Sequence, residues 1–174
     1  MTVTVRRLTP ADAPAYRAAR LAALQADPAA FLTNAAEFAA LGDDALAARL
    51  APDAPGVTLG AFLNTDPDLV GLLTLVREAA PPLAHRVNVY GVSVAPQARG
   101  QGVGVALVAA GVELARSWAG VTSLHLAVMD SQPAALRLYE RAGFRVWGTR
   151  PDAVRRDGHA YAEHWLSLDL TAPA

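Results

Sequence analysis

Cysteine and lysine are both missing from this chain of 174 residues. The absence of cysteine excludes disulfides, thiolate metal ligands and a cysteine nucleophile. The absence of lysine excludes the P-loop of nucleotide-binding proteins, because that loop requires the pattern G-x-x-x-x-G-K-[ST]. It also makes every one of the 15 basic residues an arginine.

Excess charge and long apolar segments are missing as well. The basic residues stand against 16 acidic ones, and the resulting net charge of −1 removes the electrostatic basis for nucleic-acid binding. No apolar run reaches the ~18 residues of a membrane-spanning helix, and the first residues lack the apolar segment of a signal peptide. We therefore expect a cytoplasmic protein with no nucleic-acid or membrane partner. Hydrophobic residues make up 53% of the chain, so we expect residues 1–174 to form one domain with a substantial core.

The hydrophobic periodicity of the chain predicts an α/β fold with a mixed sheet. Expected strands cover residues 2–8, 57–63, 69–77, 87–94, 121–129, 144–148 and 161–170. Expected helices cover residues 10–25, 34–50 with a break at 42–44, a long stretch from 103, and 133–142.

The most informative segment runs from Tyr90 to Leu114 and combines a strand, a glycine-rich turn and an apolar helix. In the turn, Arg99, Gly102 and Gly104 form an R-x-x-G-x-G pattern. A helix N-terminus offers unpaired N–H groups and partial positive charge, and glycine lets a phosphate approach the backbone. The pattern therefore predicts a diphosphate site. A Rossmann fingerprint is one residue longer, G-x-G-x-x-G, and a turn rich in glycine only for tight packing remains the alternative.

The strand before this turn changes its apolar face. Val87 and Val89 lie at odd positions, whereas Val92 and Val94 lie at even positions. Because side chains alternate along a strand, one extra residue at Gly91, a β-bulge, would return all four valines to one face. A strand buried on both faces is the alternative.

The helix after the turn carries two apolar stripes. The stripe expected to pack on the sheet contains Val103, Leu107, Ala110, Gly111, Leu114 and Trp118. A second stripe, of Val105, Val108 and Val112, is expected on the opposite side. Unless another part of the chain covers that second stripe, it predicts self-association as a homodimer.

Two motifs resemble those of the GNAT acetyltransferases. Residues 94–104 resemble the acetyl-CoA loop V-x-P-x-x-R-G-x-G-x-G, and residues 132–144 resemble the second signature N-x-x-A-x-x-L-Y-x-x-x-G-F. The motifs occur in the family's order with a strand between them, so the resemblance covers nearly the whole chain. It implies the GNAT acyl-CoA N-acyltransferase fold, with a mixed sheet of about six to seven strands and about four helices. It also implies an N-acetyltransferase that moves the acetyl group of acetyl-CoA, as co-substrate, to a primary amine of a small molecule or peptide by direct attack in a ternary complex.

The resemblance assigns the acetyl-CoA contacts to two segments. The backbone of Val92, Ser93 and Val94 would pair with the pantetheine arm as an added strand would, and one of its N–H groups would receive the thioester oxyanion. The turn would hold the diphosphate through Arg99, Gly100, Gln101, Gly102, Val103, Gly104 and Val105.

Tyr139 matches the family's general acid for the departing thiolate. Because a thiol has a pKa of about 8.5 and a phenol of about 10, full proton transfer is uphill by roughly 2 kcal/mol. We therefore expect Tyr139 to act mainly as a hydrogen-bond donor to sulfur. The alternative is a packing residue against Leu136 and Phe144.

Two departures from the family pattern affect the site. Gln132 replaces the family's Asn, and Gln is not a favoured N-cap, which leaves its contact with CoA open. Ala127 stands where some members carry a catalytic Glu. The base that deprotonates the amine is then either a water chain or one of Glu37, Tyr90, Asp130 and Glu163.

Other functions remain open at this stage. A catalytically silent acyl-CoA-binding sensor or scaffold would keep the same motifs, and a Rossmann-type nucleotide binder would bind nucleotide without CoA. The four histidines form no zinc motif, so no metal site is expected. The acceptor is not readable, because its pocket would come from the first two helices and the last strands.

Overall fold

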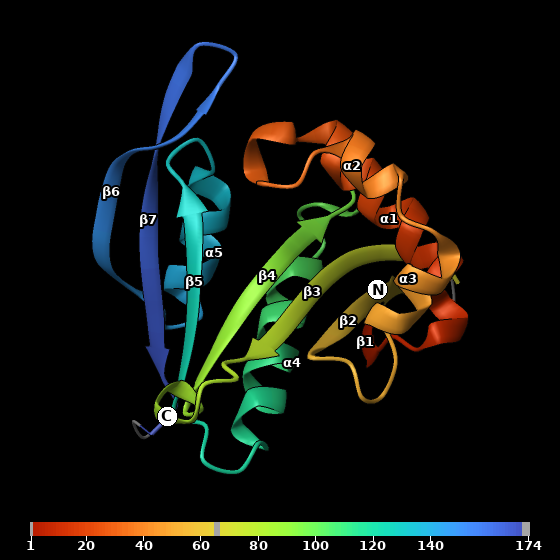
Figure 1. The fold of residues 1–174 in the computed structure, drawn as a ribbon, viewed down its shortest axis with the longest axis horizontal. Helices are drawn as coiled ribbons and strands as arrows, with labels where there is room; N and C mark the ends of the chain where they lie inside the picture. Colours follow the sequence, from red (N-terminus) through yellow and green to blue (C-terminus); the bar gives the residue numbers. More distant parts are fainter. Residues whose placement is uncertain (1, 65–66, 172–174) are drawn as a thin grey trace.

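The computed structural model describes residues 2–64 and 67–171 and contains one seven-stranded mixed sheet. The strand order is β1-β2-β3-β4-β5-β7-β6, which agrees with the expected α/β class (Figure 1). The strands are β1 (Val3–Arg7), β2 (Gly56–Leu63), β3 (Leu69–Arg77), β4 (Arg86–Val94), β5 (Ser123–Met129), β6 (Arg145–Arg156) and β7 (His159–Asp169). Part of the loop between β2 and β3, residues 65 and 66, lies outside the described residues.

Five α-helices and four short 3₁₀ helices connect these strands within the described residues. The α-helices are α1 (Ala13–Ala26), α2 (Ala35–Ala39), α3 (Asp43–Arg49), α4 (Val103–Arg116) and α5 (Pro133–Arg141). The 3₁₀ helices are η1 (Pro10–Asp12), η2 (Pro28–Ala30), η3 (Pro81–Leu83) and η4 (Pro96–Ala98). The predicted break at 42–44 is confirmed, because it separates α2 from α3. None of the described helices is long and apolar enough to span a membrane.

The sheet separates into two halves between β4 and β5. These parallel strands pair only over Arg86–Asn88 and Ser123–His125. Beyond that point β4 stays paired with β3, and β5 stays paired with β7. Figure 1 shows the two strands diverging toward the end where α5 and the α1–α2 segment lie. The last residues of β4 therefore present a strand edge that none of the described strands covers.

The predicted bulge in β4 is confirmed. Leu72 of β3 pairs with Ser93, whereas Thr74 pairs with Tyr90, so β4 contains one residue more than β3 over this interval. Gly91 lies in that interval with φ +62°, a left-handed conformation that glycine adopts without a steric penalty. The bulge lies where β4 begins to diverge from β5, and it increases the local bend of the strand.

Two apolar cores occupy the two faces of the sheet. On one face, α4 packs on β3 and β4 through residues such as Leu107, which is fully buried with Leu75 and Val87. On the other face, α1, α2 and α3 enclose a second core around Phe38 and Leu72.

The expectation that Val105, Val108 and Val112 lie opposite the sheet-facing side of α4 is wrong for two of the three valines. Val108 and Val112 are only 4% and 9% exposed, and they belong to the same core as Leu107. Each valine follows a sheet-facing residue by one position, which is about 100° around the helix, so the buried arc is broad rather than two opposed stripes. Of the three valines only Val105 is exposed. The argument for a homodimer therefore loses its basis.

The last hairpin is longer than the sequence pattern predicted. β6 was expected at 144–148 but continues to Arg156, where Asp157 and Gly158 form a two-residue turn with φ +50° and +78°. An Asp-Gly pair is a strong hairpin signal, and it was overlooked. Pro151 does not end the strand, because β6 is an edge strand and its register shifts between Arg150 and Val154.

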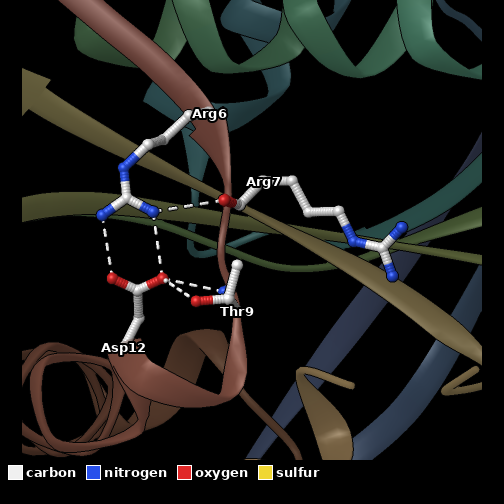
Figure 2. A network of polar contacts seen from close by, with 4 residues as sticks. All are labelled: Arg6, Arg7, Thr9 and Asp12. Atoms are coloured by element: carbon white, nitrogen blue, oxygen red, sulfur yellow. Dashed lines mark hydrogen bonds and ion pairs between the residues drawn. The ribbon is translucent and has the colours of Figure 1, made fainter. Parts of the chain in front are cut away.

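A polar network fixes the start of the first helical segment to β1 (Figure 2). Both carboxylate oxygens of Asp12 accept hydrogen bonds from the Arg6 guanidinium, at 2.8 and 2.9 Å. One of them also accepts from the Thr9 backbone N–H and hydroxyl. These contacts, Arg6 foremost, hold the pKa of Asp12 well below its usual range against the opposing effect of burial.

Candidate active site in the cleft between the diverging strands

A cleft of about 690 Å³ lies where β4 and β5 diverge. Its lining comes from the end of β4, the turn that precedes α4, the first turn of α4 and one side of α5. The remaining lining comes from the C-terminal part of α1, η2 and the first residues of β3. Segments far apart in sequence therefore enclose one volume, and both motifs contribute to it.

Two glycines of the turn are open to the cleft. Gly100 and Gly102 have φ of +74° and +82°, and a Cβ atom added to either would have no neighbour within 4 Å. Tight packing therefore does not explain these two glycines. Gly104 differs, because a Cβ there would lie 3.0 Å from Leu138 of α5. The packing interpretation holds for Gly104 and fails for the other two.

The N-terminus of α4 faces this cleft without a capping side chain. Its N-cap is Gly102, no side chain caps the first turn, and that turn contains no acidic residue. Arg99 and Arg141 line the same cleft, and Arg99 Nε donates to the carbonyl oxygen of Val94 at 3.2 Å. Unpaired N–H groups, the helix dipole and two guanidinium groups together favour a bound anion here.

The strand side of the cleft is the uncovered edge of β4. Val92, Ser93 and Val94 all line it, and none of them pairs with β5. An extended, amide-containing molecule could hydrogen-bond to this edge as a further strand would.

Tyr139 of α5 lines the cleft while its ring is buried. It is 7% exposed and packs edge-on against Phe144, with ring centres 6.0 Å apart. Burial raises the pKa of Tyr139 well above its usual value. The phenol therefore stays protonated at neutral pH and can donate a hydrogen bond into the cleft. Packing and donation are compatible here, because the ring makes the contacts and the hydroxyl is not used by them.

Gln132 and Gln101 differ in their position relative to the cleft. Gln132 lines the cleft, but its Nε2 donates to Oδ1 of Asp27 at 3.2 Å, which connects α5 to the end of α1. Gln101 donates to the carbonyl oxygen of Gln97 at 2.7 Å and does not line the cleft. Of the residues expected to contact acetyl-CoA, Gln101 alone lies outside the lining.

None of the four side chains considered as a base lines the cleft. Glu37 accepts from the Asn34 N–H at the start of α2. Tyr90 is 56% exposed on β4. Asp130 lies in the exposed turn after β5, and Glu163 lies on β7 opposite Met129 and Arg150.

Sequence inspection missed several lining residues. Arg141 follows Ala134 and Leu138 at the i, i+4, i+7 spacing of one helix face, so the second motif contained the signal. Asp27 and Phe31 also line the cleft. They belong to no motif, and only the packing of α1 and η2 on the sheet brings them to the site.

Several known acetyltransferases are similar to this chain. The Acetyltransferase (GNAT) family model matches residues 21–144, which include both motifs. Mycothiol acetyltransferase from Salinispora tropica is 39% identical over 90 residues, which is 51% of this chain but only 29% of that relative's length. L-amino acid N-acetyltransferase AaaT from Escherichia coli is 29% identical over 120 residues, covering 68% of this chain and 72% of the relative.

The fold is also similar to a crystal structure of yncA, a putative acetyltransferase from Salmonella typhimurium, with its cofactor acetyl-CoA. The TM-score is 0.79 at 20% identity, and the match covers 100% of this chain and 97% of the other. At this identity the similarity establishes the fold.

Proposed function

The chain belongs to the acetyltransferase (GNAT) family, and from that premise we propose that it transfers the acetyl group of acetyl-CoA to a primary amine of a small molecule or peptide. The amine attacks the thioester directly while both substrates are bound. The observation that carries this proposal is the continuity of the cleft, which joins the N-terminus of α4, the uncovered edge of β4 and Tyr139.

Each part of the cleft matches one part of acetyl-CoA. The open glycines Gly100 and Gly102 give the diphosphate access to the first N–H groups of α4, and Arg99 adds positive charge. The β4 edge offers N–H and C=O groups to the amides of the pantetheine arm. The thioester is then placed between β4 and Tyr139.

The residues around the thioester would stabilise negative charge that develops first on its carbonyl oxygen and then on its sulfur. When the amine nitrogen bonds to the carbonyl carbon, negative charge grows on the carbonyl oxygen, and a β4 N–H stabilises it. When the C–S bond breaks, charge moves to sulfur, and the Tyr139 hydroxyl donates a hydrogen bond to it. Because the pKa of Tyr139 is raised, complete proton transfer to the thiolate is less favourable than for an exposed phenol. The amine releases its proton through water that enters the open cleft.

The names of the similar proteins support a small acceptor. One is named for an L-amino acid and the other for mycothiol, and both names specify acetyl transfer. These names describe the relatives and not the acceptor of this chain.

The test measures binding and transfer separately. Calorimetry should detect acetyl-CoA binding, with no comparable binding of ATP or NAD. Release of free CoA thiol should then depend on an added amine across a panel of amino acids, amino-acid amides, polyamines and peptides. Binding without thiol release for any amine would instead identify an acyl-CoA-binding module without catalysis. Nucleotide binding without CoA binding would contradict the proposal altogether.

A further inference from the structure

The guanidinium of Arg20 of α1 stacks on the Phe31 ring but lacks hydrogen-bond acceptors among the described residues. Its Nη1 atom is enclosed, but no hydrogen-bond acceptor reaches it. Among the described residues, no carboxylate forms an ion pair with Arg20. No hydrogen bond from Nε or Nη2 is found among the described residues either, and neither atom is enclosed as Nη1 is. An enclosed donor without an acceptor is unfavourable and uncommon in native proteins, so this one requires an explanation.

Arg20 does not itself line the cleft, but it lies between the bulge of β4 and Phe31, which does. A Cβ atom added to Gly91 would lie 3.4 Å from Nη1 and 3.9 Å from Nη2. The guanidinium carbon also lies 4.4 Å from the centre of the Phe31 ring, and Phe31 lines the cleft. The charge is therefore held beside the strand to which the thioester is assigned.

The charges around Arg20 favour a bound anion. Burial lowers the pKa of Arg20, Tyr16 opposes that effect, and repulsion from Arg49 of α3 adds to it. A carboxylate would accept from Nε–H and Nη2–H, which are not enclosed, and reduce the repulsion between the two guanidinium groups. Guanidinium is suited to this because its planar N–H groups match a carboxylate in a bidentate geometry.

We propose that Arg20 binds the carboxylate of the acceptor, so that the preferred acceptors are α-amino acids rather than amines without an acid group. This assignment rests on the proposed acetyltransferase function. In an α-amino acid a single carbon separates the carboxylate from the amine. A carboxylate held beside Gly91 therefore keeps the amine close to β4, where its nitrogen can reach the thioester carbon.

The phosphates of acetyl-CoA do not account for Arg20. They are assigned to the turn after β4, where Arg99 and Arg141 line the cleft, whereas Arg20 contacts the bulge earlier in the strand. Two anion sites at two places along β4 fit two anionic substrates, and each substrate then has its own arginine.

The test compares neutral L-amino acids with their amides, such as leucine with leucinamide, in the wild type and in Arg20→Met. The paired substrates share the amine and side chain and differ in the carboxylate. The measured quantity is the ratio of kcat/KM for the acid to that for the amide, and comparison between enzymes cancels the different basicity of the two amines. Loss of a desolvated charge partner should lower this ratio at least about 30-fold. Arg20→Lys keeps the positive charge but not the planar guanidinium, so it should retain part of the preference for the acid over the amide.

Arg116→Met is the matched control, because it removes the same charge from the far end of α4 and should leave the ratio unchanged. An unchanged ratio in Arg20→Met would overturn the assignment. If that unchanged ratio comes with an equal loss of activity toward acid and amide, Arg20 only packs on Phe31.

A second readout does not require turnover or a variant. With CoA present, millimolar leucine should raise the melting temperature of the wild type more than leucinamide does. An equal effect of both compounds would overturn the carboxylate site. If leucine binds selectively but no amine in the panel causes thiol release, the carboxylate site stands and the transferase function fails.

Discussion

The two walls of the cleft are built in different ways. The motif wall, formed by the end of β4, residues 99–105 and α5, includes the unpaired backbone edge of β4 and a turn with two open, positive-φ glycines. The α1 wall, formed by α1 and η2, presents small alanines together with Asp27 and Phe31. A backbone site suits a ligand that never changes, such as the CoA carrier. Side chains on a helix can be exchanged without altering the backbone, which suits the wall that recognises an acceptor.

The largest expected effect concerns the backbone site. Gly102→Asp should weaken acetyl-CoA binding roughly 100-fold or more, because a carboxylate would project into the open space assigned to the diphosphate and like charges cost several kcal/mol. Isothermal titration calorimetry measures the change. Asp tolerates the left-handed conformation better than most residues, so the fold should survive.

Gly158→Asp is the matched control for that variant. Gly158 also has a positive φ, +78°, and no neighbour within 4 Å of an added Cβ, but it lies in the turn between β6 and β7. It should have the same conformational cost and leave acetyl-CoA affinity unchanged. Equal affinity losses in both variants would contradict the assignment of the diphosphate to the motif wall.

The next effect concerns Tyr139. Tyr139→Phe keeps the ring contact with Phe144 and removes only the hydroxyl, so kcat and kcat/KM should fall together by about 10² while KM changes little. Steady-state kinetics with acyl-CoA analogues of different thiol acidity provides the sharper measurement. The variant should recover part of its deficit as the leaving thiol becomes more acidic. If wild type and variant respond identically along that series, Tyr139 is a packing residue.

A smaller effect concerns the contact between the two walls. Asp27→Ala and Gln132→Ala each break the 3.2 Å hydrogen bond between α1 and α5. Each should weaken acetyl-CoA binding by about 3- to 10-fold, as expected for a partly buried hydrogen bond to a carboxylate. The double variant should lose no more than the stronger single variant, because both substitutions remove the same interaction. Fully additive losses would show that the two residues act independently.

The contrast between the walls also explains what the sequence could predict. The turn at 99–105 and the bulge at Gly91 depend on local backbone requirements, which glycine positions and strand periodicity report directly. Tyr139 was found because it belongs to a motif with fixed spacing. Arg20 and Asp27 belong to no such pattern. Their roles depend on how α1 packs against β4 and against the start of α5, which is 105 residues from Asp27. The second stripe on α4 was placed on the wrong side for the same reason: a helix pattern gives the apolar arc but not every neighbour that covers it.

The smallest expected effect tests how the α1 wall is held in place. Asp12→Asn should lower the free energy of unfolding by about 1 kcal/mol at pH 7, which is about 2–4 °C in melting temperature for a chain of this size. The estimate is modest because the Arg6 side chain is 47% exposed, and solvent screens its ion pair with Asp12. Asp152→Asn in the exposed Asp152–Arg155 pair of β6 is the control and should leave the midpoint unchanged.

The stabilisation by Asp12 should decrease as the pH falls. The pKa of Asp12 is lowered in the folded protein and is about 3.9 in the unfolded chain, so the unfolded state takes up a proton first as the pH falls. The stabilisation is therefore complete at pH values above the pKa of Asp12 in the unfolded chain, and it is lost on acidification from about pH 4 downward. The melting temperatures of wild type and Asp12→Asn should accordingly differ at pH 7 and converge toward pH 2, with acetyl-CoA affinity the same in both at pH 7. A difference that persists in acid would mean that Asp12 acts through neutral hydrogen bonds to Thr9 rather than through its charge.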